Sequence, residues 1–168
     1  MPDIRIALVD DHSIVRQGLR SILEREEGLE VVGEASSLPT ALSMVAATSP
    51  DIVLLDLKLS TEGDVEGLEL ARMLTQRHPG VGVLVLTTFL DERLVVQAIQ
   101  HGAKGYVLKD VDAVELIRSI RAVHRGESAL TPTARPWWCE ACMATAIATG
   151  TSDSPTASSR FCSCWRTG

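Results

Sequence analysis

Two hydrophobic periodicities alternate along residues 4–127. Five short apolar runs with turn or acidic residues at their ends are typical of buried strands; they cover residues 4–10, 29–35, 51–57, 81–89 and 104–110. Between them, apolar residues recur every three or four positions, as on one face of a helix; these segments cover residues 13–28, 39–50, 67–80, 91–102 and 112–127. The pattern therefore predicts five strand–helix repeats.

Capping residues indicate where the predicted helices begin and end. Ser13 stands where an N-cap is expected and Gly28 lies just past the end of the first helix, while Asp91 and Gly102 bracket the fourth. In the last helix, four apolar residues are expected to share one face, namely Val114, Ile117, Ile120 and Val123.

Strand–helix alternation with short connections predicts a parallel sheet that has helices on both faces. Five strands fit a doubly wound, flavodoxin-like α/β fold with strand order 2-1-3-4-5. In such a sheet, ligands bind at the carboxyl ends of the strands, near the switch point between the first and third strands. Functional side chains should therefore follow directly after the strands.

The expected positions carry a charged set. Asp10 and Asp11 end the first strand, Asp56 the third, Thr87 the fourth and Lys109 the fifth. Carboxylates that converge need a cation to relieve their repulsion, and an all-oxygen site with room for water suits Mg²⁺. Such an ion can link a carboxylate to a phosphoryl oxygen, which makes Asp56 a candidate nucleophile for an aspartyl phosphate, with Lys109 as a second positive charge.

Four motifs, LVDDH, DIVLLDL, VLVLTTF and AKGYVLKD, resemble the receiver domain of LuxR-type (NarL/FixJ-like) two-component response regulators. The resemblance extends from residue 4 to about residue 125. It implies that a sensor histidine kinase phosphorylates Asp56. It also implies a Mg²⁺ ion held by Asp11, Asp56 and the backbone carbonyl of Lys58, with Asp10 acting partly through water.

The resemblance further implies that Thr87 and Tyr106 form a switch pair that remodels a protein-interaction surface and favours a homodimer on phosphorylation. The domain would catalyse its own phosphorylation and dephosphorylation without being a dedicated enzyme. One alternative is a receiver-like interaction domain that works without phosphorylation. A flavin-binding domain on the same fold is disfavoured, because aromatic residues make up 4% of the chain and lie mostly near its end.

The segment after Asp56, DLKLSTEGDVEGLEL, departs from the family pattern. Leu59 and Ser60 replace the usual Met-Pro pair, and Gly67 lies eleven positions after Asp56 where the family has glycine at eight. We expect this longer loop, residues 58–67, to alter the lifetime of the phosphorylated state and the fit to the kinase. His12, next to the acidic pair, is interpreted as an ordinary loop residue.

Charge and hydropathy narrow the choice of partners. The chain has a formal net charge of −6 and a pI of about 5.2, which disfavours nucleic-acid binding by this domain itself. No apolar run is long enough to cross a membrane, and the first ten residues lack signal-peptide features. A cytoplasmic protein without a membrane partner is therefore expected.

We predict a receiver domain over residues 1–126, a linker over 127–136 and an irregular, disordered segment over 137–168. The resemblance implies a parent protein that regulates transcription, yet no helix-turn-helix follows the linker. DNA binding is thus expected only if the true gene product has that domain.

Residues 137–168 contain all three tryptophans and all four cysteines of the chain. Cysteines 139, 142, 162 and 164 could supply four thiolates to zinc, although the residues between them lack strand or helix periodicity. Disulfides are disfavoured in the cytoplasm. A frameshift is the favoured interpretation: one alternative frame can encode TDREVAVLQLLAHG, which resembles the first helix of a LuxR-type DNA-binding domain.

Overall fold

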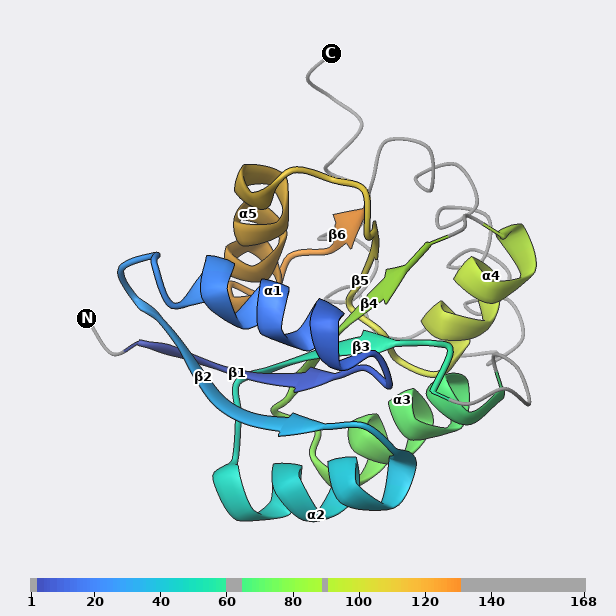
Figure 1. Cartoon of the computed structure of the whole chain (residues 1–168). Coiled ribbons are helices and arrows are strands. Elements are labelled where there is room, and N and C mark those ends of the chain that lie inside the picture. Colours follow the sequence, from blue (N-terminus) through green and yellow to red (C-terminus); the bar gives the residue numbers. More distant parts are fainter. Residues whose placement is uncertain (1–2, 60–64, 89–90, 131–168) are drawn as a thin grey trace.

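The structure is a computed structural model, and it describes residues 3–59, 65–88 and 91–130 (Figure 1). The elements in chain order are β1 (Ile4–Val9), α1 (Ser13–Leu23), β2 (Leu29–Ala35), α2 (Leu38–Thr48), β3 (Ile52–Asp56), α3 (Val65–Arg77), β4 (Gly82–Thr87), α4 (Glu92–Gln100), β5 (Gly105–Leu108), α5 (Ala113–His124) and β6 (Ala129–Leu130). The predicted segment 137–168 lies outside the described residues, as does most of the loop after Asp56.

The sheet confirms the predicted strand order and adds one short strand. Its order is β2-β1-β3-β4-β5-β6, and every pairing is parallel. β6 lies in the segment that we predicted as a linker, where Ala129 pairs with Gly105 of β5. A two-residue strand carries no periodicity that the sequence could have revealed.

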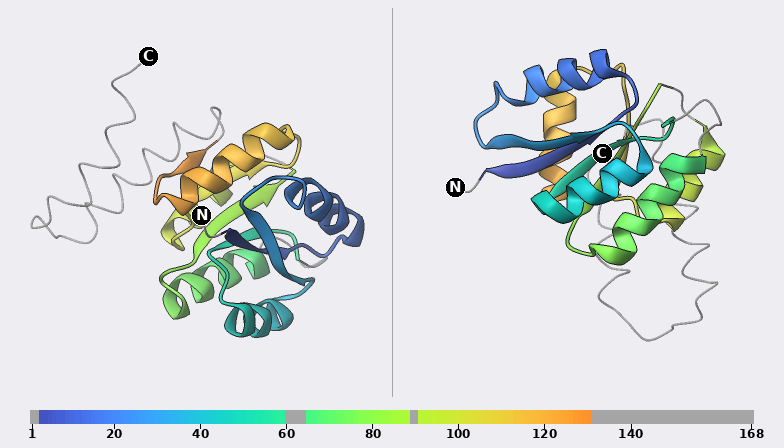
Figure 2. Two further views of the ribbon diagram at one scale, coloured as in Figure 1. Left: turned by 90° about the vertical axis from the view of Figure 1, so that its left-hand side faces the viewer. Right: turned by 60° about the horizontal axis from the view of Figure 1, so that its bottom comes forward.

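Helices cover both faces of the sheet (Figures 1 and 2). α1 and α5 lie on one face, and α2, α3 and α4 lie on the other. The strands alternate accordingly: Ile52 and Leu54 of β3 belong to the apolar cluster under α1 and α5, whereas Val53 and Leu55 belong to the opposite cluster. All four side chains are at most 1% exposed, because a parallel strand in such a fold is buried on both faces.

Two predicted helix ends differ from the structure. α1 has His12, not Ser13, at its N-cap position, and no side chain caps it. α1 also ends at Leu23, and the chain turns through Gly28, whose φ of +83° suits glycine, before it enters β2. Residues 24–27 are all charged, which favours a turn at the surface over a further helical turn. The apolar periodicity alone did not show where the helix ends.

The bounds predicted for α4 are confirmed more closely. The carboxylate of Asp91 accepts a hydrogen bond from the backbone amide of Arg93 at 2.8 Å, as an N-cap should. Gly102 follows the helix with a φ of +87°.

The predicted apolar face of α5 includes one wrong member. Ile117, Ile120 and Val123 are buried, but Val114 is 64% exposed. Val114 lies six residues before Ile120, which is about 120° around a helix of 3.6 residues per turn. It therefore lies at the edge of the apolar stripe, in the first turn of the helix.

Residues on both sides of the loop after β3 are closely packed. Leu59, which stands where the family has methionine, is 5% exposed and packs in the core. Gly67 of α3 lies directly against the backbone of Leu57, so that a β-carbon there would collide with the Leu57 carbonyl. The described residues on both sides of positions 60–64 are therefore closely packed.

Within the described ranges, no helix combines the length and apolar character needed to span a bilayer.

Candidate functional site

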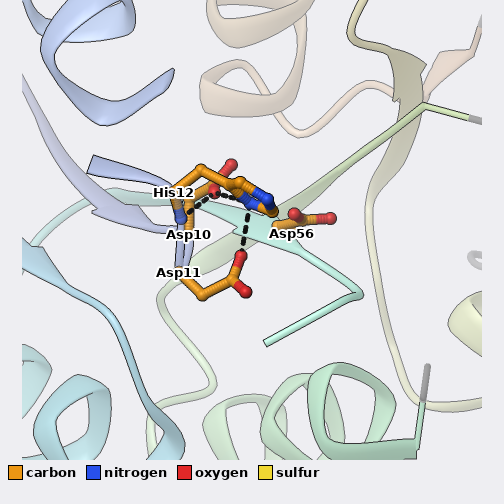
Figure 3. A group of neighbouring side chains, drawn as sticks. All are labelled: Asp10, Asp11, His12 and Asp56. Carbon is orange, nitrogen blue, oxygen red and sulfur yellow. Dashed lines mark hydrogen bonds and ion pairs between the residues drawn. The ribbon is translucent and has the colours of Figure 1, made fainter. Parts of the chain in front are cut away.

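Parallel pairing brings Asp10 and Asp56 side by side at the carboxyl edge of the sheet (Figure 3). Val9 of β1 is in register with Leu55 of β3, so the next residue of each strand is one of the two aspartates. Asp10 is 2% exposed and Asp56 is 5% exposed. Two buried carboxylates with oxygen atoms within 4.8 Å of each other require a positively charged partner.

Lys109 supplies that partner. Its ammonium Nζ donates to Oδ2 of Asp10 and to Oδ2 of Asp56, at 2.6 Å each, and its side chain is 15% exposed. The backbone amide of Lys109 donates to the Thr87 carbonyl at 2.7 Å, which fixes the residue to the end of β4. Residues from β1, β3, β4 and β5 thus meet at one edge, as the strand pattern predicted.

The electrostatics show two carboxylates sharing one ammonium. Burial raises the pKa of Asp56 and the negative charge of Asp10 raises it further, although the hydrogen bond and charge of Lys109 and the amide of Lys58 oppose this. Burial lowers the pKa of Lys109, but its hydrogen bonds to both aspartates outweigh burial and the net pKa is raised. The lysine is therefore held in its charged form, and the site keeps a negative excess.

Asp11 and His12 form the solvent-facing rim of the site (Figure 3). The imidazole Nδ1 of His12 lies 2.6 Å from Oδ1 of Asp11 and 3.3 Å from Oδ1 of Asp10. The backbone amide of His12 also donates to Oδ1 of Asp10 at 2.8 Å. The structure thus places His12 within the acidic group, whereas its sequence position alone suggested an ordinary loop residue.

The acidic group fits a divalent cation. One ligand atom from each of Asp10, Asp11, His12 and Asp56 lies within 4.8 Å of the other three. Carboxylate oxygens are the ligands that hard divalent ions prefer, and one lysine cannot neutralise three carboxylates. Lys58 adjoins the site, because its amide donates to Oδ1 of Asp56 at 3.2 Å; the role predicted for its carbonyl stays a prediction.

Thr87 and Tyr106, the predicted switch pair, lie on the same face of the sheet. Thr87 follows Val85 by two positions on β4, and Tyr106 of β5 pairs with Val85 in register. Tyr106 is fully buried and Thr87 is 4% exposed. Their positions are compatible with direct coupling, while the switching role itself stays a prediction.

Arg16 is a site neighbour that the sequence reasoning missed. Its Nη1 donates to the backbone carbonyl of Asp10 at 2.5 Å, and its Nε lies 3.4 Å from Glu34. It follows His12 by one helical turn on α1, a spacing that could have directed attention to the acidic end of β1. The contact ties α1 and β2 to the peptide that carries the acidic pair.

Comparisons with known proteins show the family of this chain. Residues 6–121 match the response regulator receiver domain family. DevR/DosR of Mycobacterium tuberculosis, a DNA-binding transcriptional activator, is 41% identical over 127 residues, which cover 76% of this chain and 57% of that protein. The transcriptional regulatory protein LnrK of Bacillus subtilis is 40% identical over 129 residues, covering 77% and 57%.

Among solved structures, a LuxR-family two-component response regulator from Aurantimonas superposes with a TM-score of 0.75 and 36% identity, covering 84% of this chain and 99% of that one. The parallel sheet, the acidic strand ends and the buried lysine define a receiver domain. The chain belongs to the response regulator receiver domain family, with LuxR-type relatives, and that family is not one of dedicated enzymes. It spans 57% of the length of the two curated relatives.

Proposed function

We propose that this domain accepts a phosphoryl group on Asp56 from a sensor histidine kinase, in the presence of Mg²⁺, and thereby switches a protein-interaction surface. The observation that carries the proposal is the buried Asp56 carboxylate, held 2.6 Å from the Lys109 ammonium beside the acidic pair at the end of β1. A structural ion pair would not need a third carboxylate, that of Asp11, beside the two that Lys109 contacts.

The transfer follows from the roles of these groups. A carboxylate oxygen of Asp56 forms the new O–P bond while the P–N bond of the kinase phosphohistidine breaks, and the imidazole takes the bonding electron pair. Asp10, Asp11, Asp56 and the Lys58 carbonyl would hold Mg²⁺, which when bound neutralises charge on the transferred group. The Lys109 ammonium, which lies 2.6 Å from Asp56, would form an ion pair with the negative charge that the transfer adds.

The switch would begin at Thr87. Phosphorylation adds up to about two negative charges beside its hydroxyl. We propose that the hydroxyl donates to a phosphoryl oxygen and that the ring of Tyr106 packs into the space that Thr87 leaves. The surface formed by α4, β5 and α5 then changes its population of conformers, which favours a homodimer.

The wider role extends beyond the part of the chain that the structure describes. We propose a receiver over residues 1–126 in a cytoplasmic regulator of transcription that catalyses its own phosphorylation and dephosphorylation. Both curated relatives named above are transcriptional regulators by name. DNA binding would require a helix-turn-helix, which we propose is encoded out of frame with residues 137–168.

A small phosphodonor tests the proposal directly. The full chain is incubated with acetyl phosphate and Mg²⁺, and intact mass is measured before and after hydroxylamine treatment. We expect one hydroxylamine-sensitive phosphoryl group in the wild type and in Asp110→Asn, an exposed control near the site, but none in Asp56→Asn. A folded wild type that never gains the group would favour the alternative, a receiver-like domain that works without phosphorylation.

A further inference from the structure

We propose that Arg16 is a positioning residue for phosphoryl transfer: through the backbone carbonyl of Asp10 it fixes the peptide that carries Asp11, and it thereby sets the affinity of the site for Mg²⁺. The inference rests on the proposed function, because it concerns the cation that the transfer uses. It deepens that function by naming a residue of α1 that acts on the site through the backbone.

Asp10 is held through both of its backbone polar groups. Its amide donates to the carbonyl of Ala35 at the end of β2, at 3.2 Å, and its carbonyl accepts from Nη1 of Arg16 at 2.5 Å. That carbonyl belongs to the peptide that joins Asp10 to Asp11, and a peptide group is planar. Holding the carbonyl oxygen therefore fixes the direction in which the chain leaves β1 toward Asp11.

Asp11 is the acidic residue that depends most on this direction. The buried carboxylates of Asp10 and Asp56 are each held by Lys109 at 2.6 Å. The carboxylate of Asp11 is instead 34% exposed and lies on the rim of the site against His12 (Figure 3). Its position is therefore set more by its backbone than by packing. A ligand whose backbone is fixed in advance loses less conformational freedom when it binds an ion.

Arg16 is itself held in place by a group of charged side chains. Its side chain is 17% exposed, and its Nε lies 3.4 Å from Oε2 of Glu34 on β2. Glu34 also accepts from Arg20 at 2.7 Å, and Arg20 contacts Glu24 at the same distance. These four side chains carry two positive and two negative charges. Arg16 thus brings a hydrogen-bond donor to Asp10 within a group that is neutral as a whole.

A purely electrostatic role for Arg16 predicts the opposite effect on Mg²⁺ binding. A guanidinium beside an acidic group repels a second cation, so its removal would tighten the binding of Mg²⁺. A positioning role predicts weaker binding after the same removal, because the peptide between Asp10 and Asp11 loses its anchor. The loss of a residue that orients a metal ligand typically costs about 10–100-fold in metal affinity. The sign of the change therefore separates the two roles.

Arg20 provides a matched control, because it lies one helical turn after Arg16 and pairs with the same carboxylate. Arg20→Met removes its ion pairs with Glu24 and Glu34 and leaves the bond from Arg16 to Asp10 in place. Arg16→Met removes that bond together with an ion pair to Glu34. If Arg16 only stabilised the fold, the two variants would change the Mg²⁺ affinity alike.

The first test titrates Mg²⁺ into the full chain without a phosphodonor and follows binding by NMR of the backbone amides. We expect Arg16→Met to weaken Mg²⁺ binding by at least about tenfold and Arg20→Met to change it by less than about threefold. Arg16→Gln, which shortens the side chain but keeps it polar, should show the same loss. It also serves as the test variant if methionine at this position prevents folding.

Phosphorylation by acetyl phosphate gives a second readout. Arg16→Met should need at least about tenfold more Mg²⁺ for half of its maximal rate, while that maximal rate stays within about threefold of the wild type. A wild type that binds Mg²⁺ but accepts no phosphoryl group would reject the proposed function and leave the comparison of affinities valid. Equal Mg²⁺ affinities in Arg16→Met and Arg20→Met, or tighter binding in Arg16→Met than in the wild type, would overturn the positioning role.

Discussion

Replacing Lys109 by methionine removes the ammonium that contacts both buried aspartates and keeps most of the apolar stem. The two contacts are 2.6 Å long, which corresponds to roughly 6 kcal/mol of gross attraction each at an effective dielectric constant of about 20. Much of that attraction only offsets the cost of burying the charges. Removing one partner from a buried pair costs about 3–5 kcal/mol net, and we expect Lys109→Met to fall in that range.

The loss is large against the about 5–15 kcal/mol that stabilises a typical domain, so urea unfolding followed by circular dichroism can measure it. Lys104→Met is the matched control, because Lys104 is exposed just before β5; we expect it to change stability by no more than about 0.5 kcal/mol. With EDTA present, the two variants should differ by several kcal/mol. Equal stabilities would refute the idea that Lys109 neutralises a buried acidic pair.

Mg²⁺ should recover part of this loss, because an ion can take over the neutralising role. At a hundred times its Kd, an ion that binds only the folded state adds about 2.7 kcal/mol. We expect Lys109→Met to gain at least as much as the wild type, and a smaller gain would mean that Lys109 is needed to hold the site open for the ion.

Three further predictions concern other parts of the chain. Because burial raises the pKa of Asp56, its contribution to stability is complete below the unfolded pKa and is lost as pH rises through the folded pKa. Asp56→Asn should therefore melt roughly 3–5 °C above the wild type at neutral pH, with the difference vanishing in acid; a lower melting temperature at neutral pH would contradict this. Gly67→Ala should cost about 1–3 kcal/mol in urea unfolding through collision with Leu57, whereas Gly18→Ala on α1, which has open space, should gain about 0.5–1 kcal/mol. Sequencing the coding DNA from codon 136 to well beyond codon 168 should reveal, in another frame, a helix-turn-helix that continues past residue 168, and its absence would reject the frameshift.

The sequence predicted the fold well where periodicity is strong. Five strands and five helices follow from the apolar spacing, and their alternation favours the doubly wound, flavodoxin-like sheet whose strand order the structure confirms. β6 was not predicted, because a strand of two residues cannot show a hydrophobic period. Val114 was misplaced because a stripe drawn at spacings of three drifts around a helix, which turns once every 3.6 residues.

The site was predictable to the extent that backbone topology places it. Asp10, Asp56 and Lys109 follow strands whose carboxyl ends must share one edge, so no side-chain detail was needed. His12 and Arg16 reach the acidic pair from the start of α1, and their contacts depend on side-chain conformations that spacing does not determine. The ion pairs of Lys109 with both aspartates likewise emerge only in three dimensions.

The central claim is that Asp56, and no other residue, receives the phosphoryl group. Reduction by borohydride converts an aspartyl phosphate to homoserine, so the modified position can be read by peptide mapping after incubation with acetyl phosphate and Mg²⁺. We predict homoserine at position 56 and unmodified aspartate at positions 10 and 11. Homoserine at position 10 or 11, or at none of the three positions in a folded protein, would contradict the account.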